Sequence, residues 1–361
     1  DLFIVGRIVV SLEKLLVDFV SKMTDMNQKG GEKDVHRLED ELSSGDDLEE
    51  KIEEPEYAQE LIIVDPHAID VDFNHCRIAK IENLEQLTRC ETLCLRQNLL
   101  KKIEGLNTLT ALRELEFYDN QLTVIENLDA LVNLELLDLS FNRILKIENL
   151  GALTKLKKLF LVNNRITKIE NLEHLTQLDM LELGSNRIRV LENLSTLTNL
   201  RNLFVGKNKI TKLQGLDSLV NLTSLSIQSN RILKVEGLEK LVNLDEFYIS
   251  NNGIEKVEGL ENNVKLTTLD MAGNRIRKIE NVGHLVALEE FWFNNNQIDD
   301  WKDLNELTSL KNLKTVYLER NGIWFDPENP ERSDPSYRRK VKLALPWIQQ
   351  IDATMAQLFK S

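Results

Sequence analysis

The sequence predicts an α/β solenoid, a horseshoe of about twelve 22-residue coils with a parallel sheet along its concave side. The main observation is an asparagine that recurs at a constant interval within the pattern L-x-L-x-x-N-x-[I/L]. One copy reads LDLSFNRI (137–144) and another reads LELGSNRI (181–188). The repeated asparagines are Asn98, Asn120, Asn142, Asn164, Asn186, Asn208, Asn230, Asn252, Asn274 and Asn296.

This period and pattern are typical of leucine-rich repeats, in which each coil contributes one short strand and contacts only its neighbours. The repeat extends further, because Cys76 takes the asparagine position exactly one period before Asn98. At the other end, the interval from Asn296 to Asn321 exceeds the usual period, so one coil is three residues longer. We expect the asparagine amides to pair with backbone groups that the curving chain leaves open, forming a structural ladder.

The second half of each coil reads I-E-N-L-x-x-L, as in residues 125–131. The pattern predicts a turn or short helix on the outer side, with Leu and Ile pointing inward. Lys and Glu flank the apolar residue in several coils, for example Lys146 and Glu148 around Ile147. We interpret these charges as a solvated rim, since exposed ion pairs contribute little to stability.

Composition divides the chain into an N-terminal extension (1–62), the solenoid (63–323) and a C-terminal cap (324–361). The extension is predicted to be largely acidic and disordered, because residues 32–60 carry 13 acidic and 3 basic side chains. This stretch accounts for −10 of the chain's formal charge of −14, so the solenoid is only slightly acidic. The absence of a basic stripe argues against a nucleic-acid partner.

Two features of the extension carry no assigned function. Residues 1–22 combine a short apolar segment with a helical pattern, but they are too short and too charged to span a bilayer. No small-residue cleavage site follows them, which argues against a signal peptide. We expect no membrane association. Ser43 and Ser44 lie among acids and could accept phosphate, although simple solvation is the favoured interpretation.

The sequence lacks the residue patterns of an enzyme. Its three cysteines, Cys76, Cys90 and Cys94, form no C-x-x-C pair, which indicates a reducing compartment. The five histidines are scattered without metal-ligand spacing, and neither a glycine-rich phosphate loop nor a nucleophile elbow is found. We therefore predict a protein that is not an enzyme and that needs no cofactor or metal.

The middle residue of each L-x-L points away from the core, because side chains alternate along a strand. Aromatic residues take this position in every second coil from Phe160 to Trp292, and acids take several of the others. Rings two coils apart are not expected to stack directly, so we interpret the column as a protein-binding patch rather than rings that cover each other. The acids favour a partner with Lys or Arg. Coil by coil, the position holds Glu116, Asp138, Phe160, Glu182, Phe204, Ser226, Tyr248, Asp270, Trp292 and Tyr317.

The C-terminal part is predicted to close the open end of the core. Residues 324–335 contain three prolines and are predicted to form a loop. A helix beginning near Tyr337 and a turn near Asp352 follow, and their apolar residues are expected to cover the last coil.

The strictly periodic I-E-N-L coil and the cap pattern Tyr-Arg-x-x-Val…Leu-Pro…Ile-Asp resemble the leucine-rich-repeat regulatory subunits of type-1 protein phosphatase. The resemblance covers residues from about 70 to 355 and includes the strings LCLRQN (93–98), KLFLVNN (158–164), MLELGSNRI (180–188) and TVYLERN (315–321). It implies a non-catalytic subunit whose concave face binds the catalytic subunit of type-1 serine/threonine protein phosphatase and controls its activity, biogenesis or localisation. It also implies a ternary complex with phosphatase inhibitor three, a role in mitosis, and localisation in nucleus and cytoplasm.

The resemblance places the phosphatase-binding positions of the family on eight residues of this chain. Glu290 adds an acid one strand-step before Trp292, on the same face. Residues 1–22 and a loop from Trp324 to about Ser336 depart from the family. The eight positions are Asp138, Phe160, Glu182, Phe204, Asp270, Glu290, Trp292 and Tyr317.

Two alternative functions remain open at this point. An adaptor for RNA-processing partners would be favoured by a basic inner strip, which the sequence does not show. A cytoskeletal or ciliary adaptor would be favoured by a long coiled coil after the cap, which the sequence through Ser361 does not contain.

Overall fold

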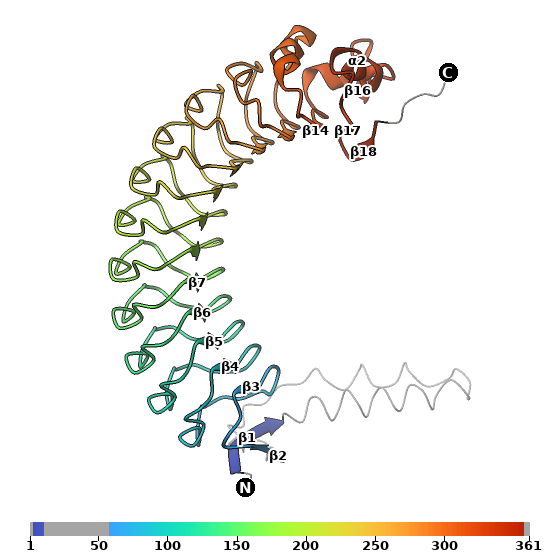
Figure 1. Ribbon diagram of the computed structural model, residues 1–361. Helices are drawn as coiled ribbons and strands as arrows, with labels where there is room; N and C mark the ends of the chain where they lie inside the picture. Colours follow the sequence, from blue (N-terminus) through green and yellow to red (C-terminus); the bar gives the residue numbers. More distant parts are fainter. Residues whose placement is uncertain (1–2, 11–57, 357–361) are drawn as a thin grey trace, which may run out of the picture.

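The computed structural model describes residues 3–10 and 58–356, which form a horseshoe (Figure 1). Twelve three-residue strands, β3 to β14, lie side by side in parallel along the concave side and define eleven complete coils. The predicted solenoid is thus confirmed. The strands are β3 (Asp70–Asp72), β4 (Thr92–Cys94), β5 (Glu114–Glu116), β6 (Leu136–Asp138), β7 (Lys158–Phe160), β8 (Met180–Glu182), β9 (Asn202–Phe204), β10 (Ser224–Ser226), β11 (Glu246–Tyr248), β12 (Thr268–Asp270), β13 (Glu290–Trp292) and β14 (Thr315–Tyr317).

The sheet register follows the sequence period. Asp138 lies opposite Phe160, and Phe160 lies opposite Glu182, so equivalent residues of successive coils are direct neighbours. The central residue of each strand, such as Leu159, is buried in the core, while its two neighbours face outward. The repeat therefore converts a sequence position into a continuous column on the concave surface.

The asparagine ladder is present as expected. In one coil, the Asn186 amide donates to the carbonyl oxygens of Leu161 at 2.8 Å and Leu183 at 3.0 Å. Its side-chain oxygen accepts from the Ile166 backbone N–H at 3.0 Å. One buried side chain thus bonds to three backbone groups in two adjacent coils. These hydrogen bonds satisfy backbone groups that the tight bend of the chain would otherwise leave unpaired.

A second asparagine column, which the sequence analysis did not identify, lies in the I-E-N-L segment. Asn171 has a φ of +58° and donates to the Ile147 carbonyl oxygen at 2.6 Å. In four other coils a glycine takes the same position, for example Gly215 with a φ of +68°. Gly and Asn adopt this left-handed conformation at lower cost than most residues, which explains why the position holds one or the other in these coils.

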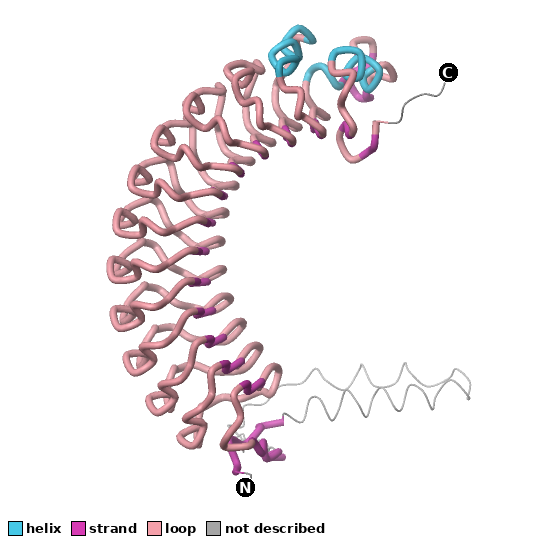
Figure 2. Tube along the Cα trace, viewed as in Figure 1, coloured by secondary structure: helices cyan, strands magenta, loops and turns pink. Residues whose placement is uncertain are grey.

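The outer side of the solenoid is built mainly from turns (Figure 2). The coil that is three residues longer than the others contains the 3-10 helix η1 (Trp301–Ser309) in place of simple turns. The Asp300 side chain accepts from the Lys302 backbone N–H at 2.8 Å and starts this helix. Its buried residues Leu304 and Leu307 continue the apolar core.

At the N-terminal end, β1 (Phe3–Val10) pairs antiparallel with β2 (Ala58–Val64). This pairing joins the start of the chain to the segment before the first coil, and the sequence did not predict it. Ser43, Ser44 and the helical pattern after residue 10 lie outside the described residues.

The C-terminal end contains more structure than a loop and a helix. The 3-10 helix η2 (Gly322–Trp324) leads into an antiparallel pair of β15 (Phe325–Asp326) and β16 (Asn329–Ser333), where the sequence predicted a loop. Its turn is explained by Asp326, whose side chain accepts from the Glu328 backbone N–H at 3.0 Å, with a proline between them.

The expected cap helix is α2 (Tyr337–Ala344), followed by β17 (Gln350–Ile351) and β18 (Thr354–Met355). β17 continues the parallel sheet beyond β14, and β18 turns back against it. The buried apolar residues Val341, Leu345 and Ile348 cover the end of the core, as the cap of a solenoid must.

One buried polar residue, Asn263, interrupts the leucine column of this core. Asn263 is fully buried at the position of Leu241 and Leu285 in the neighbouring coils, and its side-chain oxygen has no hydrogen-bond partner. Its amide donates to the carbonyl oxygens of Leu238 and Leu241, both of which already accept a backbone N–H.

We expect Asn263→Leu to raise the free energy of unfolding by about 1–2 kcal/mol, because it removes an unpaired buried acceptor and restores the leucine column. Chemical denaturation would measure the change. Asn262→Leu, at the exposed neighbouring position, serves as the control and should give no gain. An unchanged or lowered stability for Asn263→Leu would contradict the prediction.

Candidate protein-binding surface

The eight candidate binding residues lie on the concave side, on seven of the sheet's strands. We refer to them together as the concave strip. Asp270 is buried with 6% exposure, whereas the other seven are half-buried. The register stacks equivalent positions of successive coils, and Ser226 and Tyr248 occupy the two strands between Phe204 and Asp270. The members of the strip are Asp138, Phe160, Glu182, Phe204, Asp270, Glu290, Trp292 and Tyr317.

The C-terminal half of the strip is an aromatic cluster around Trp292. Its ring centroid lies 5.6 Å from that of Tyr317 and 6.3 Å from that of Tyr248, two coils away. Tyr248 and Trp292 meet edge to face, at an interplanar angle of 62°. The two rings therefore do not stack directly, as expected, but they still contact each other across the coil between them. Asp270 lies between Tyr248 and Trp292, and its short side chain is turned toward the Ala272 backbone N–H at 3.0 Å, which leaves room for the two rings to meet.

Glu290 fixes the orientation of the Trp292 ring. The indole N–H of Trp292 donates to the Glu290 carboxylate at 2.9 Å, which confirms that both side chains lie on the same face. The ring thus presents an apolar surface while its only donor is already paired. A fixed aromatic ring is suited to binding because little conformational freedom is lost when a partner covers it.

A cavity of about 350 Å³ lies beside this cluster. Trp292 and Tyr317 form aromatic walls, and Asp270 and Ser250 contribute polar groups. Burial raises the pKa of Asp270, although the Ser250 hydroxyl and the Ala272 N–H oppose that shift by hydrogen bonding. A carboxylate next to aromatic faces is a favourable environment for a cationic side chain.

The middle of the strip places Glu182 between the rings of Phe160 and Phe204. Burial, with a smaller contribution from Asp138, raises the pKa of Glu182. Glu182 is half-buried, so part of its side chain remains accessible to a partner.

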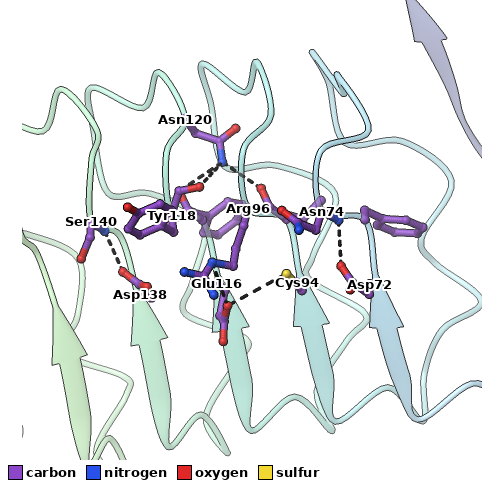
Figure 3. A network of polar contacts seen from close by, with 12 residues as sticks. Asp72, Asn74, Cys94, Arg96, Glu116, Tyr118, Asn120, Asp138 and Ser140 are labelled. Carbon is purple, nitrogen blue, oxygen red and sulfur yellow. Dashed lines mark hydrogen bonds and ion pairs between the residues drawn. The ribbon is translucent and has the colours of Figure 1, made fainter.

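The concave surface on the N-terminal side of the strip carries a polar network instead (Figure 3). The Arg96 guanidinium lies 3.5 Å from the Glu116 carboxylate and 4.6 Å from the centre of the Tyr118 ring. Burial raises the pKa of Glu116, and Arg96 opposes this shift. Asp138, at the border of this network, accepts from the Ser140 backbone N–H at 2.8 Å. The sequence column included Glu116 but did not reveal its pairing with Arg96.

The described residues contain no group of three or more His, Cys, Asp or Glu side chains arranged to hold a metal ion. Within the same residues, no helix has both the length and the apolar character needed to cross a membrane.

Comparison with known proteins supports the repeat class. A family described as "Leucine-rich repeat" matches residues 106–206, and one described as "Leucine Rich repeats (2 copies)" matches residues 220–262 and 264–306. Among solved structures, an internalin from Listeria monocytogenes is 25% identical with a TM-score of 0.62, covering 81% of this chain and 90% of its own. A leucine-rich-repeat protein from Leptospira interrogans is 22% identical with a TM-score of 0.60, covering 74% and 73%.

Among curated relatives, "Protein phosphatase 1 regulatory subunit 7" of Homo sapiens is 59% identical over 59 residues. Its counterpart in Xenopus tropicalis is 54% identical over 57 residues. The human match covers 16% of this chain and 14% of the relative, so the likeness is high but local. Fold, repeat matches and relatives together define a leucine-rich-repeat protein-interaction scaffold.

Proposed function

We propose that this protein is a non-catalytic regulatory subunit that binds the catalytic subunit of type-1 serine/threonine protein phosphatase through the concave strip. The names of the matched relatives support a phosphatase partner. We further propose that the complex can include phosphatase inhibitor three and acts in the nucleus and cytoplasm, including in mitosis.

The observation that carries the proposal most strongly is the aromatic cluster around Trp292. Three rings, from Tyr248, Trp292 and Tyr317, lie together on a concave surface beside the carboxylates of Asp270 and Glu290. Fixed aromatic side chains with neighbouring charges are typical of the energetic centre of a protein interface. The carboxylates predict that Lys or Arg side chains of the phosphatase contact this part of the strip.

The proposal can be tested by size-exclusion chromatography of the purified protein with the purified type-1 catalytic subunit. We expect the two to elute together as a complex. A variant with Trp292→Ala and Phe204→Ala, shown to be folded by circular dichroism, should elute separately from the phosphatase. If this folded variant co-eluted with the phosphatase as fully as the parent does, the phosphatase would not bind through the concave strip.

Binding should also release protons in mildly acidic buffer. Burial holds the pKa values of Glu182 and Asp270 above their ordinary values of 4.5 and 3.8 in the free protein. A cationic side chain placed beside them would lower these pKa values. At a pH between the lower pKa values of the complex and the higher pKa values of the free protein, these carboxyl groups are protonated in the free protein but not in the complex. The affinity therefore falls as the pH drops through this window.

Calorimetric titration in two buffers of different ionisation enthalpy would measure this proton release. Glu182→Gln should reduce it, because the amide does not titrate. Glu148→Gln, on the rim beside Lys146, is the matched control and should leave the release unchanged. Proton uptake on binding would contradict the expected direction.

A further inference from the structure

The C-terminal cap contains a groove that the concave strip does not use. It lies between α2 and the β17–β18 turn and has a volume of about 510 Å³. Buried Ile351 and half-buried Ala356 contribute to its lining, together with the exposed side chains of Leu343 (71%) and Met355 (60%). The remaining lining residues are Pro335, Arg338, Arg339, Lys342 and Thr354.

The groove is cationic in a chain whose formal charge is −14. Three basic side chains line it, and its lining includes no carboxylate. Arg338 and Lys342 have structural roles: Arg338 donates to the carbonyl oxygens of Ile351 and Thr354 at 2.7 and 3.1 Å, and Lys342 donates to that of Ile348 at 2.6 Å. These bonds hold the helix against the turn, so the groove is built before any partner binds.

Arg339 is the available cation. It is exposed and makes no hydrogen bond or ion pair within the part of the chain that the structure describes. Its guanidinium can therefore bind a carboxylate without breaking an existing contact, and its planar donors match the two oxygens of that group. Leu343, four residues further along the same helix, lies on the same side and offers an apolar contact next to that charge.

We propose that this groove is a second docking site, which takes an acidic segment of a protein partner with a bulky apolar residue. The apolar residue lies against Leu343, Met355 and Ile351, while an acidic side chain pairs with Arg339. Charge complementarity selects the partner, since the basic side chains of the groove attract such a segment, whereas the carboxylates of the concave strip repel it. The site is independent of the concave strip and of the proposed phosphatase complex.

A fluorescein-labelled peptide of sequence Glu-Asp-Leu-Phe-Asp-Glu, titrated with the full-length protein by fluorescence polarisation, tests the proposal. We expect saturable binding that weakens when the salt concentration rises from about 0.05 to about 0.3 M. Arg339→Glu should lower the affinity by about tenfold or more, because it replaces attraction with repulsion. Arg332→Glu is the matched control: it makes the same change at an exposed arginine outside the groove and should stay within about twofold of the parent.

Three results would overturn the proposal. The first is equal affinity of the parent and a folded Arg339→Glu variant, and the second is equal affinity for a peptide whose Leu and Phe are replaced by Gly. The third is a gain of about tenfold or more on removing residues 357–361, which would show that the protein's own end occupies the groove. Trp292→Ala should leave peptide binding unchanged, so the test separates this site from the concave strip.

Discussion

Asp352→Ala is expected to lower the free energy of unfolding by about 3 kcal/mol, the largest stability effect of any single change considered for this protein. The Asp352 carboxylate is 7% exposed and accepts from the backbone N–H groups of Leu318 at 2.8 Å and Glu319 at 3.0 Å. It also accepts from the Tyr337 hydroxyl at 3.3 Å. In an inner coil the N–H equivalent to that of Leu318, such as that of Phe293, donates to a backbone carbonyl oxygen of the next coil. Asp352 supplies that acceptor at the end of the solenoid, so its loss leaves three donors unpaired at once.

Burial, together with Asp352, raises the pKa of Tyr337 above its usual range, so the tyrosine stays protonated and keeps donating to the carboxylate. Asp352→Asn retains an acceptor oxygen and should cost less than the alanine variant. Asp326→Ala is a control in the same cap, since its side chain serves a single exposed turn. Urea denaturation would compare the three, and hydrogen exchange should show the C-terminal coils opening first. Equal stability of Asp352→Ala and the parent would show that this residue does not anchor the cap.

Trp292→Ala should weaken phosphatase binding by about 2 kcal/mol or more, which corresponds to a roughly thirtyfold higher Kd. The ring lies between Tyr248 and Tyr317 and is oriented by Glu290, so truncation removes the centre of the cluster and leaves two rings less well packed. The fold should survive, because the side chain points away from the core. Biolayer interferometry with immobilised catalytic subunit would measure the loss.

Two further variants test whether the loss of affinity is specific to the concave strip. Glu182→Ala should have a smaller effect than Trp292→Ala, unless the carboxylate meets a buried cation of the partner. Glu148→Ala, on the rim, should leave binding unchanged. If Glu148→Ala and Trp292→Ala lowered the affinity equally, the effect would not belong to the concave strip.

The solenoid could be predicted because its determinants are local and repeat. Each ladder asparagine carries the same hydrogen bonds to its neighbours, and each L-x-L buries the same two positions. The constant period therefore sets the register directly, with Asp138 opposite Phe160. The outward-facing column of the L-x-L positions followed from that register, since it depends only on which strand residue faces outward. The choice of the eight strip residues rested on the family resemblance.

Features that depend on side-chain conformation could not be predicted in this way. The contact between Tyr248 and Trp292 depends on Asp270 turning toward its own backbone. The second asparagine column could have been recognised, because Asn171 and Gly215 share a position that requires a positive φ. The restriction of this position to Asn or Gly was the sequence signal that indicated a left-handed backbone conformation.

The ends of the chain were hardest to predict, because no repeat constrains them. The antiparallel pair of β1 and β2 joins segments that lie far apart in the sequence, which no local pattern reveals. The cap groove depends on how α2 and the β17–β18 turn pack together, which Arg338 and Lys342 secure through backbone carbonyls. The sequence predicted the cap helix but not the space beside it.

The most direct test of the central claim is a calorimetric titration of the full-length protein with the purified type-1 catalytic subunit. The concave-strip account predicts a saturable complex of one molecule of each protein, with an affinity that falls as salt is raised and that Trp292→Ala reduces. Absence of binding heat, together with separate elution of the two folded proteins, would contradict it. Equal affinity for the parent and Trp292→Ala would likewise show that the phosphatase does not bind at the concave strip.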